Sequence, residues 1–280
     1  MIKKSPILLL FIFASGLAQD KVKGSRNVKT EQHELAPFHT IEMTGEFKIG
    51  ILKGRQPQVE IKADDNVHDL ILTDVRDGVL YIKPIKQLVR TKALELKVTF
   101  ADTLRSLLVG GEVEMESLQD IYVKDFTLET SNDAKVYLTI TSNKFKLVNG
   151  DGAKAQLNVT AQEIVCQLNQ SSKVEALFNA PLMDIDLYEK ASGKIEGETA
   201  ELQLRLDQSS KFEGENLAAL KANVLAQGNS EAKVNAKDSI NVSLSGKSEL
   251  EIYNQPHIVL DKFTDEAKLA KKEFSRGLFK

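Results

Sequence analysis

Six lysines begin strand-like segments about 20 residues apart, so a repetitive fold would stack them in one column. They are Lys135, Lys154, Lys173, Lys194, Lys211 and Lys233. Neighbouring strands lie about 4.8 Å apart, so this column would form a positive stripe suited to an anionic glycan or another anionic polymer. The alternative is a solvated face that glutamates neutralise, since Glu175, Glu196 and Glu213 each follow a lysine by two residues.

A second cluster combines two carboxylates with a guanidinium group. Asp184 and Asp186 alternate in one segment, and Arg205 follows one repeat later. Polysaccharide-cleaving β-helical enzymes gather acids and bases on one lateral sheet, so this cluster is the candidate site of a glycan-modifying enzyme. Outward carboxylates beside an arginine are more often a cross-strand ion pair. We therefore expect no enzyme, and we keep the catalytic interpretation as the alternative.

The other polar residues give no signal for a metal or a cofactor. Four histidines lack metal-ligand spacing, namely His33, His39, His68 and His257. Asp64-Asp65-Asn66 lacks the alternating ligands of a calcium loop, so we expect it to cap a short helical turn. No glycine-rich nucleotide loop or nucleophile elbow occurs. The net charge of −3 gives no basic excess for nucleic acid.

The residues that must position these groups form a hydrophobic triplet that returns about every 19 residues. The triplets are Phe126/Leu128/Thr130, Phe145/Leu147/Asn149, Ile164/Cys166/Leu168, Met183/Ile185/Leu187, Leu202/Leu204/Leu206, Ala222/Val224/Ala226 and Ile240/Val242/Leu244. Each has the two-residue period of a strand, and a strand pattern inside a repeat of this length indicates stacked coils. Cys166, the only cysteine, can form no intrachain disulfide and is expected to be a buried small side chain.

Each repeat contains a second strand that begins at a charged residue seven or nine positions after the triplet centre. A two-residue difference keeps the same side chains facing inward, so both strands can line one interior. The turns between them are rich in Gly, Asn, Asp and Ser. We therefore predict a right-handed parallel β-helix, a solenoid of about nine rungs, over residues 102–260.

The chain ends follow different patterns. Residues 24–101 read as strands without the repeat, including a hairpin at Asp77-Gly78, and should pack on the solenoid. Residues 261–280 are a charged amphipathic tail in which Thr264 could cap a helix that presents Phe263, Ala267, Ala270 and Phe274 on one face. We expect this tail to dock as a cap on the open solenoid end or to fray.

The N-terminus predicts export. Lys3 and Lys4 precede an apolar run and small residues that end at Ala18, which is the pattern of a signal peptide over residues 1–18. No later segment is long and apolar enough to span a membrane. We expect an exported protein of the periplasm, the cell surface or the surroundings of the cell.

Several short motifs resemble one family of secreted bacterial proteins. They are Gly24-Ser25-Arg26-Asn27-Val28, Phe38-His39-Thr40-Ile41, Gly45-Glu46-Phe47-Lys48-Ile49, Val59–Val67 and Asp77-Gly78-Val79-Leu80-Tyr81-Ile82. Their order is similar to that of the head GIN domain family of auto-transporter adhesins, which is frequent in Bacteroidetes. The resemblance implies a parallel β-helix and a surface-binding role, but it brings no catalytic or binding residues. Arg26 stands where that family usually has a second glycine.

These observations favour an exported, non-enzymatic β-solenoid for binding, adhesion or cell-envelope structure. Its partner would be a surface glycan or an envelope component. One alternative is the β-helical polysaccharide-modifying enzyme at Asp184, Asp186 and Arg205. The other is a structural module of the envelope that assembles through its exposed end.

Overall fold

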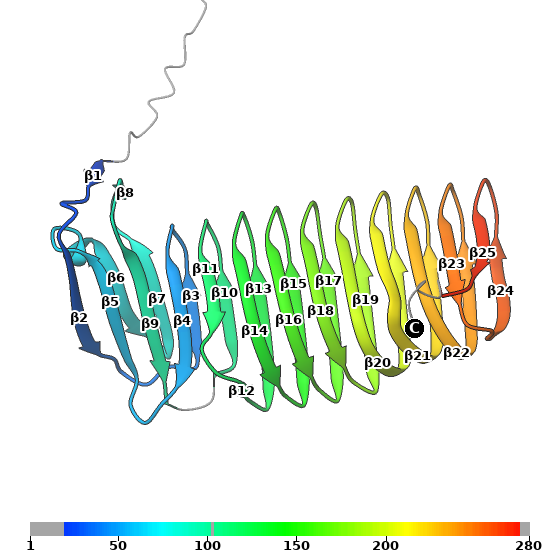
Figure 1. The fold of residues 1–280 in the computed structure, drawn as a ribbon, viewed down its shortest axis with the longest axis horizontal. Helices are drawn as coiled ribbons and strands as arrows, with labels where there is room; N and C mark the ends of the chain where they lie inside the picture. Colours follow the sequence, from blue (N-terminus) through cyan, green and yellow to red (C-terminus); the bar gives the residue numbers. More distant parts are fainter. Residues whose placement is uncertain (1–19, 102–103, 275–280) are drawn as a thin grey trace, which may run out of the picture.

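The computed structural model describes residues 20–101 and 104–274, and the predicted signal peptide lies outside them. Figure 1 shows a long solenoid whose coils succeed one another along a single axis. β-Strands make up 66% of the structure and form a solenoid of about nine turns, with N-terminal strands packed on it. The predicted solenoid is therefore confirmed.

Each coil contributes one strand to each of two layers. The first layer contains the triplet strands and comprises β3 (Thr40–Met43), β10 (Ser106–Val109), β13 (Asp125–Thr130), β15 (Lys144–Asn149), β17 (Glu163–Leu168), β19 (Leu182–Leu187), the second halves of β20 (Ser192–Leu206), β21 (Lys211–Ala226) and β22 (Glu231–Leu244), and β24 (His257–Phe263). The second layer comprises β4 (Lys48–Lys53), β11 (Glu114–Ser117), β12 (Ile121–Tyr122), β14 (Lys135–Thr141), β16 (Lys154–Thr160), β18 (Lys173–Asn179), the first halves of β20 to β22, β23 (Glu249–Tyr253) and β25 (Lys268–Lys272). Strands of successive coils pair in parallel.

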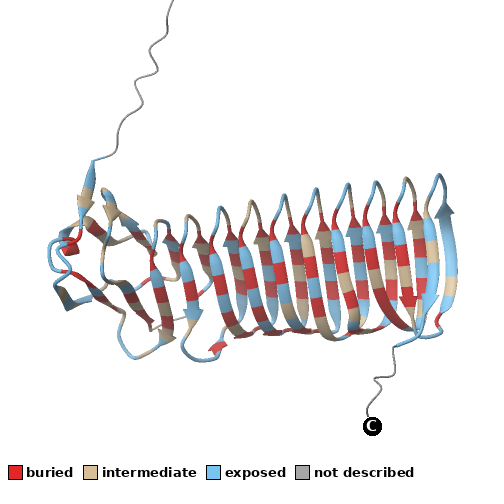
Figure 2. Ribbon diagram, turned by 45° about the horizontal axis from the view of Figure 1, so that its top comes forward, coloured by how far each residue is buried: buried red, intermediate tan, exposed pale blue. Residues whose placement is uncertain are grey.

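The interior is built from the alternation that the triplets predict. Figure 2 shows buried and exposed residues alternating along the strands of both layers. The rings of Phe126 and Phe145 stack 6.3 Å apart, and Phe178 meets Phe145 edge-on at 6.2 Å. Burial, with a smaller contribution from Asp186, raises the pKa of the Cys166 thiol far above its ordinary value. Cys166 is thus an inert interior side chain, as expected.

Left-handed turn residues connect the two layers at one edge. Most turns place one residue at positive φ, namely Asn132, Asp151, Gln170, Glu189, Gln208, Gly228, Gly246 and Asp265. Several of these side chains also bind the preceding turn: the Asp151 carboxylate accepts from the Asn132 amide at 2.9 Å. The Gln170 side-chain oxygen accepts from the Asp151 amide at 2.6 Å. These bonds tie neighbouring coils together outside the sheet ladders.

The N-terminal strands close one end of the solenoid. β7 (Val79–Pro84) and β9 (Leu94–Phe100) extend the two layers in parallel, and β6 (Ile71–Arg76) and β5 (Gln58–Asp64) then add antiparallel strands. β1 (Lys21–Lys23) pairs with β8 (Gln87–Val89). The predicted hairpin joins β6 to β7, where Asp77 and Gly78 have φ of 50° and 75°.

The outermost N-terminal strand, β2 (Val28–Glu34), carries charge on its inner side. Lys29, Glu31 and His33 lie opposite the buried Ala63, Ile61 and Val59 of β5, so they face the same side of the layer. Charged residues that point inward from an edge strand prevent another strand from adding there. The edge of β2 is therefore protected against a further strand.

The predicted helix after Thr264 is wrong, because the chain makes one more rung. Thr264 and Asp265 lie in a turn, and β25 pairs in parallel with β23. The register of β24 shifts between Val242 and Ser243, so Asp261 is an extra residue in its strand. Because of this bulge, the inward side chains Leu260 and Phe263 are three residues apart in the sequence, and the alternation of a strand is not recognisable there. Residues 275–280 of the tail lie outside the described part.

The same methyl group added at Gly197 and at Gly193 should affect stability to different extents. Gly197 has φ of 121°, and a Cβ there would lie 2.0 Å from the Phe178 carbonyl oxygen. A Cβ on the buried Gly193 would meet side chains at ordinary distances of 3.4 Å or more. Gly197→Ala should lower the free energy of unfolding by at least about 2 kcal/mol, whereas Gly193→Ala should change it by less than about 1 kcal/mol. Denaturant titration of both variants measures this, and equal effects would contradict the described coil geometry.

Candidate functional site

The structure stacks three of the six candidate lysines in register. Lys135 lies beside Lys154, and Lys154 lies beside Lys173, at the starts of β14, β16 and β18. Their neighbours in the column are Glu114 on one side and Ser192 on the other. No carboxylate of residues 20–101 or 104–274 lies within ion-pair distance of these three lysines. We call Lys135, Lys154 and Lys173 the lysine triad.

The other three lysines do not extend the triad. Lys211 follows Ser192 in the same column and pairs with Glu213 at 2.9 Å. Lys194 and Lys233 lie in the next column, where Lys194 stands between Glu175 and Glu213. The predicted six-lysine column is wrong at these two positions, because their strands begin with two extra residues. Each lysine still faces outward but is displaced by one column.

A groove lies beside the triad on the outer face of the second layer. It consists of two adjoining hollows of about 530 and 390 Å³ that share Glu116 and Tyr137. The first hollow crosses β11, β14, β16, β18 and β20, and Gln156, Asn158 and Leu177 contribute to its lining. The triad begins three of these strands, so it lies along one rim of this groove.

The groove contains outward apolar side chains that the sequence reasoning missed. Tyr137 is 37% exposed, Leu177 43% and Leu118 47%. Tyr137 follows Lys135 by two residues and Leu177 follows Lys173 by four, so all four share the outward phase of their strands. Apolar residues at the outward positions of these strands are visible in the sequence and could have predicted this groove. An aromatic ring with amides and charges along a groove can bind the apolar faces and hydroxyl groups of sugars.

The structure also brings Asp184, Asp186 and Arg205 together, on the outer face of the first layer. Asp186 lies directly beside Arg205, while Asp184 lies beside Gln203. The Arg205 guanidinium lies 5.6 Å from the centre of the Tyr188 ring, and the Tyr188 hydroxyl donates to Asp186 at 3.3 Å. Partial burial raises the pKa of Asp184, and the charges of Asp186 and Glu163 add to the effect. Asp184 and Arg205 line a hollow of about 450 Å³.

Asp64-Asp65-Asn66 neither caps a helix nor forms a calcium loop. The short 3-10 turn η1 (His68–Leu70) receives no side-chain cap. Asp64 is buried, and its carboxylate accepts from the backbone amides of Arg26 at 2.7 Å, Lys92 at 2.9 Å and Ala93 at 3.3 Å. A Cβ on Gly24 would lie 2.2 Å from the same carboxylate. The predicted cap is therefore wrong, and Asp64 instead clamps the N-terminal segment onto the fold.

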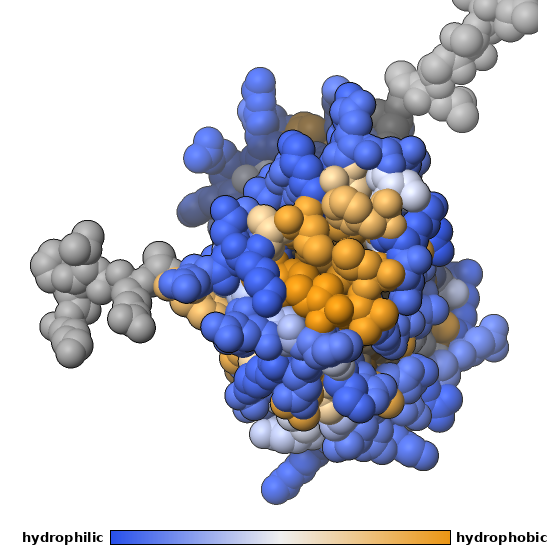
Figure 3. All heavy atoms as spheres, turned by 90° about the vertical axis from the view of Figure 1, so that its right-hand side faces the viewer, coloured by the Kyte–Doolittle hydropathy of each residue, from blue (hydrophilic) through white to orange (hydrophobic). Residues whose placement is uncertain are grey.

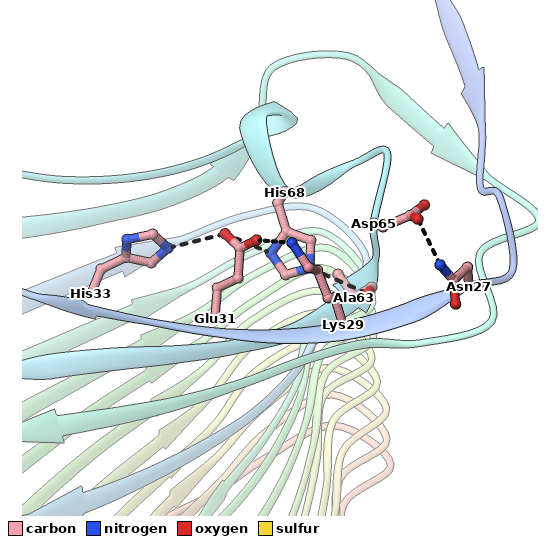
Figure 4. A network of polar contacts seen from close by, with 7 residues as sticks. All are labelled: Asn27, Lys29, Glu31, His33, Ala63, Asp65 and His68. Carbon is pink, nitrogen blue, oxygen red and sulfur yellow. Dashed lines mark hydrogen bonds and ion pairs between the residues drawn. The ribbon is translucent and has the colours of Figure 1, made fainter.

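The two neighbours of Asp64 complete this clamp. Asp65 accepts from Ser25 and, as Figure 4 shows, from the Asn27 side chain, while the Asn66 side chain accepts from the Ser25 amide. Arg26 has φ of 69°, a conformation that favours glycine. The motifs around residues 24–28 and 64–66 are thus two halves of one contact.

A further polar cluster lies close to the clamp. The carboxylate of Glu31 lies 3.5 Å from Lys29 Nζ, 3.6 Å from His68 Nδ1 and 3.9 Å from His33 Nε2 (Figure 4). Across residues 20–101 and 104–274, no three His, Cys, Asp or Glu side chains are arranged to hold a metal ion. Among the same residues no helix has the length and hydropathy needed to cross a membrane.

The Asp64 clamp predicts a pH-dependent stability. Burial alone would raise the pKa of Asp64, but its three amide donors hold it below the ordinary value. The charged carboxylate therefore stabilises the fold at neutral pH, and this contribution is lost as the pH falls below about 4. Asp64→Asn should cost about 2–3 kcal/mol of unfolding free energy at pH 7 and progressively less at lower pH. Asp69→Asn, at an exposed neighbour, is the control; equal losses in the two variants would contradict the clamp.

Comparison with known proteins agrees with this architecture. A family described as "Putative auto-transporter adhesin, head GIN domain" matches residues 37–178 and again residues 158–256. A "putative adhesin" from Parabacteroides distasonis has a similar structure, with a TM-score of 0.71 at 17% identity over 90% of this chain and 100% of its own. A "putative adhesin" from Parabacteroides merdae gives 0.65 at 16% identity, over 90% of this chain and 99% of its own.

A "Putative lipid binding protein" from Parabacteroides distasonis is also similar, with a TM-score of 0.63 at 17% identity over 90% of this chain and 100% of its own. At these identities the likeness concerns the fold alone. No curated protein matches this chain in sequence. The family match covers most of the solenoid and part of the N-terminal cap. This chain therefore belongs to the family described as "Putative auto-transporter adhesin, head GIN domain".

Proposed function

We propose that this chain is an exported, non-enzymatic binding protein of the cell envelope that holds an anionic glycan or a similar polymer against its second layer. The adhesin description of its family and of two structural neighbours supports surface binding. The signal-peptide pattern of residues 1–18 supports export to the periplasm or the cell surface.

The lysine triad carries this proposal. Three ammonium groups on adjacent strands repel one another, and none of them forms an ion pair with a described carboxylate, although Glu114 precedes Lys135 in the column. A polymer with regularly spaced anions would offset that repulsion along the whole column, and the repeat of the coils gives the column a constant spacing. The free triad contrasts with Lys211 and Lys233, which have carboxylate partners in the same chain.

The groove supplies the other half of the proposed site. Tyr137 offers a ring face for stacking, and Gln156 and Asn158 offer amides for hydroxyl groups, on strands that begin with the triad lysines. The same hollow is also lined by Glu116, Glu175, Glu196 and Lys194. A shallow surface that crosses several strands suits a section of a chain better than a small enclosed ligand. The proposal therefore assigns charge attraction to the triad and sugar contacts to the groove.

The hollow around Asp184 supports the alternative of a polysaccharide-modifying enzyme. A carboxyl group whose pKa is raised can serve as a general acid. Arg205 instead forms an ion pair with Asp207 at 3.9 Å and lies over the Tyr188 ring, whose hydroxyl bonds to Asp186, and these contacts favour an ion-paired surface. We rank binding above catalysis for this reason.

Reversing two triad charges tests the proposed binding. Lys154→Glu with Lys173→Glu should weaken binding to polygalacturonate by roughly tenfold or more at 0.15 M salt, because each lysine near an anionic surface contributes about 1 kcal/mol. Binding of the unaltered protein should also weaken as salt increases. Calorimetric titration with polygalacturonate, and with neutral dextran for comparison, measures both effects.

The matched control reverses two charges on the opposite layer. Lys146 and Lys221 are exposed on β15 and on the second half of β21. Lys146→Glu with Lys221→Glu changes the net charge equally and should leave binding to polygalacturonate within about twofold. If the two double variants lose affinity equally, or neither does, the triad is not the binding site.

A further inference from the structure

The C-terminal end of the solenoid exposes side chains that belong to its interior. In β24, Ile258 and Leu260 pair with Ile240 and Val242, and Phe263 pairs with Leu244. Those three partners are fully buried, whereas Leu260 is 51% and Phe263 48% exposed. Figure 3 shows the apolar patch that results on this face. The last described rung is therefore an uncovered cross-section of the core.

The N-terminal end of a second molecule cannot cover this patch by continuing the stack. β2 closes that end with antiparallel pairing and with Lys29, Glu31 and His33 on its inner side. β6 and β2 each have a free edge at the N-terminal end, but exposed side chains in interior register positions, such as Leu260 and Phe263, lie at the C-terminal end. The partner that this patch fits within the same protein is thus the C-terminal end of a second copy.

Two charges at this end have no ion-pair partner among residues 20–101 and 104–274. Lys271 pairs with Ile252 in the register of β25, so it stands at an inward position of the last strand. Asp261 is the extra residue of the β24 bulge. Neither takes part in an ion pair among the described residues, although their neighbours Lys268 and Lys272 pair with Glu249 and Glu251. Lys271 and Asp261 carry opposite charges on the two open strands, with Lys271 at an inward position and Asp261 on the side that lines the outer hollow of the first layer.

We propose that two copies of this chain pair through their C-terminal ends in a twofold-symmetric dimer, with β24 of each copy antiparallel to β25 of the other. A twofold axis parallel to the strands gives this arrangement and continues each layer into the second copy. Pairing Leu269 with Phe263 of the second copy brings Lys271 opposite Asp261 of the second copy. Pairing β25 with itself would instead oppose Lys268, Lys271 and Lys272 with like charges.

The size of this end sets the expected strength of the dimer. Strands of seven residues are about 23 Å long, and two layers with their side chains are about 20 Å thick. The two ends would together bury on the order of 1,000 Å², at the lower limit of specific interfaces. We therefore expect a reversible dimer with a dissociation constant in the micromolar range. This inference is independent of the proposed binding groove.

A charge exchange tests the proposal on the whole purified protein. Sedimentation velocity from 1 to 200 µM should show a monomer–dimer equilibrium. Lys271→Asp alone and Asp261→Lys alone should each weaken dimerisation by tenfold or more. The double variant that carries both changes should recover affinity to within about threefold, which a merely unfolded variant could not do. Phe263→Ser should also weaken the dimer, with melting temperature as the check on folding.

Three outcomes would overturn the dimer. The protein could remain monomeric at every concentration. It could dimerise with an affinity that none of these changes alters, which would place the interface elsewhere. It could be monomeric until residues 275–280 are deleted and dimeric afterwards, which would identify that segment as the occupant of the patch.

Discussion

Constant register between coils is the constraint on which the rest of this structure depends. In the middle coils each strand pairs residue for residue with the strand one coil earlier, so a slip of one residue would turn the apolar side chains of that strand toward water. The left-handed turn residues near Asn132, Asp151 and Gln170 keep successive coils at nearly equal length. The same register that buries Phe145 and Cys166 also aligns the outward side chains in columns.

Much of this architecture is predictable, because the sequence itself shows the length of the repeat and the even spacing that keeps apolar side chains facing inward. The triplets predict the interior strands, and the Asp77-Gly78 hairpin follows from its turn chemistry. The columns are harder to predict. Lys194 faces outward as parity requires, but two additional residues displace it beside Glu175. Even spacing along the chain determines whether a residue faces inward or outward. The residues beside it in the neighbouring coils depend on how those coils pair.

Two other differences arise where local patterns compete with tertiary contacts. Phe263, Ala267, Ala270 and Phe274 fit a helical face, yet free strand edges on β22 and β23 draw this segment into another rung. Asp64-Asp65-Asn66 resembles a cap, but its partners Ser25, Arg26 and Asn27 are some 40 residues away in sequence. Distant backbone donors outcompete a local cap when they are buried with the carboxylate. Tyr137 and Leu177 lie in the outward phase of their strands, about which the apolar triplets carry no information.

The register between coils can be measured with paired cysteines on exposed positions. Asn158 and Leu177 are register partners on β16 and β18, so their Cα atoms should lie about 4.8 Å apart. Glu175 lies two residues away along the same strand, which places it about 8 Å from Asn158. Asn158→Cys with Leu177→Cys should form an intramolecular disulfide under mild oxidation, while Asn158→Cys with Glu175→Cys should not. Equal cross-linking of the two pairs, or faster cross-linking of the second, would contradict the parallel register and the columns derived from it.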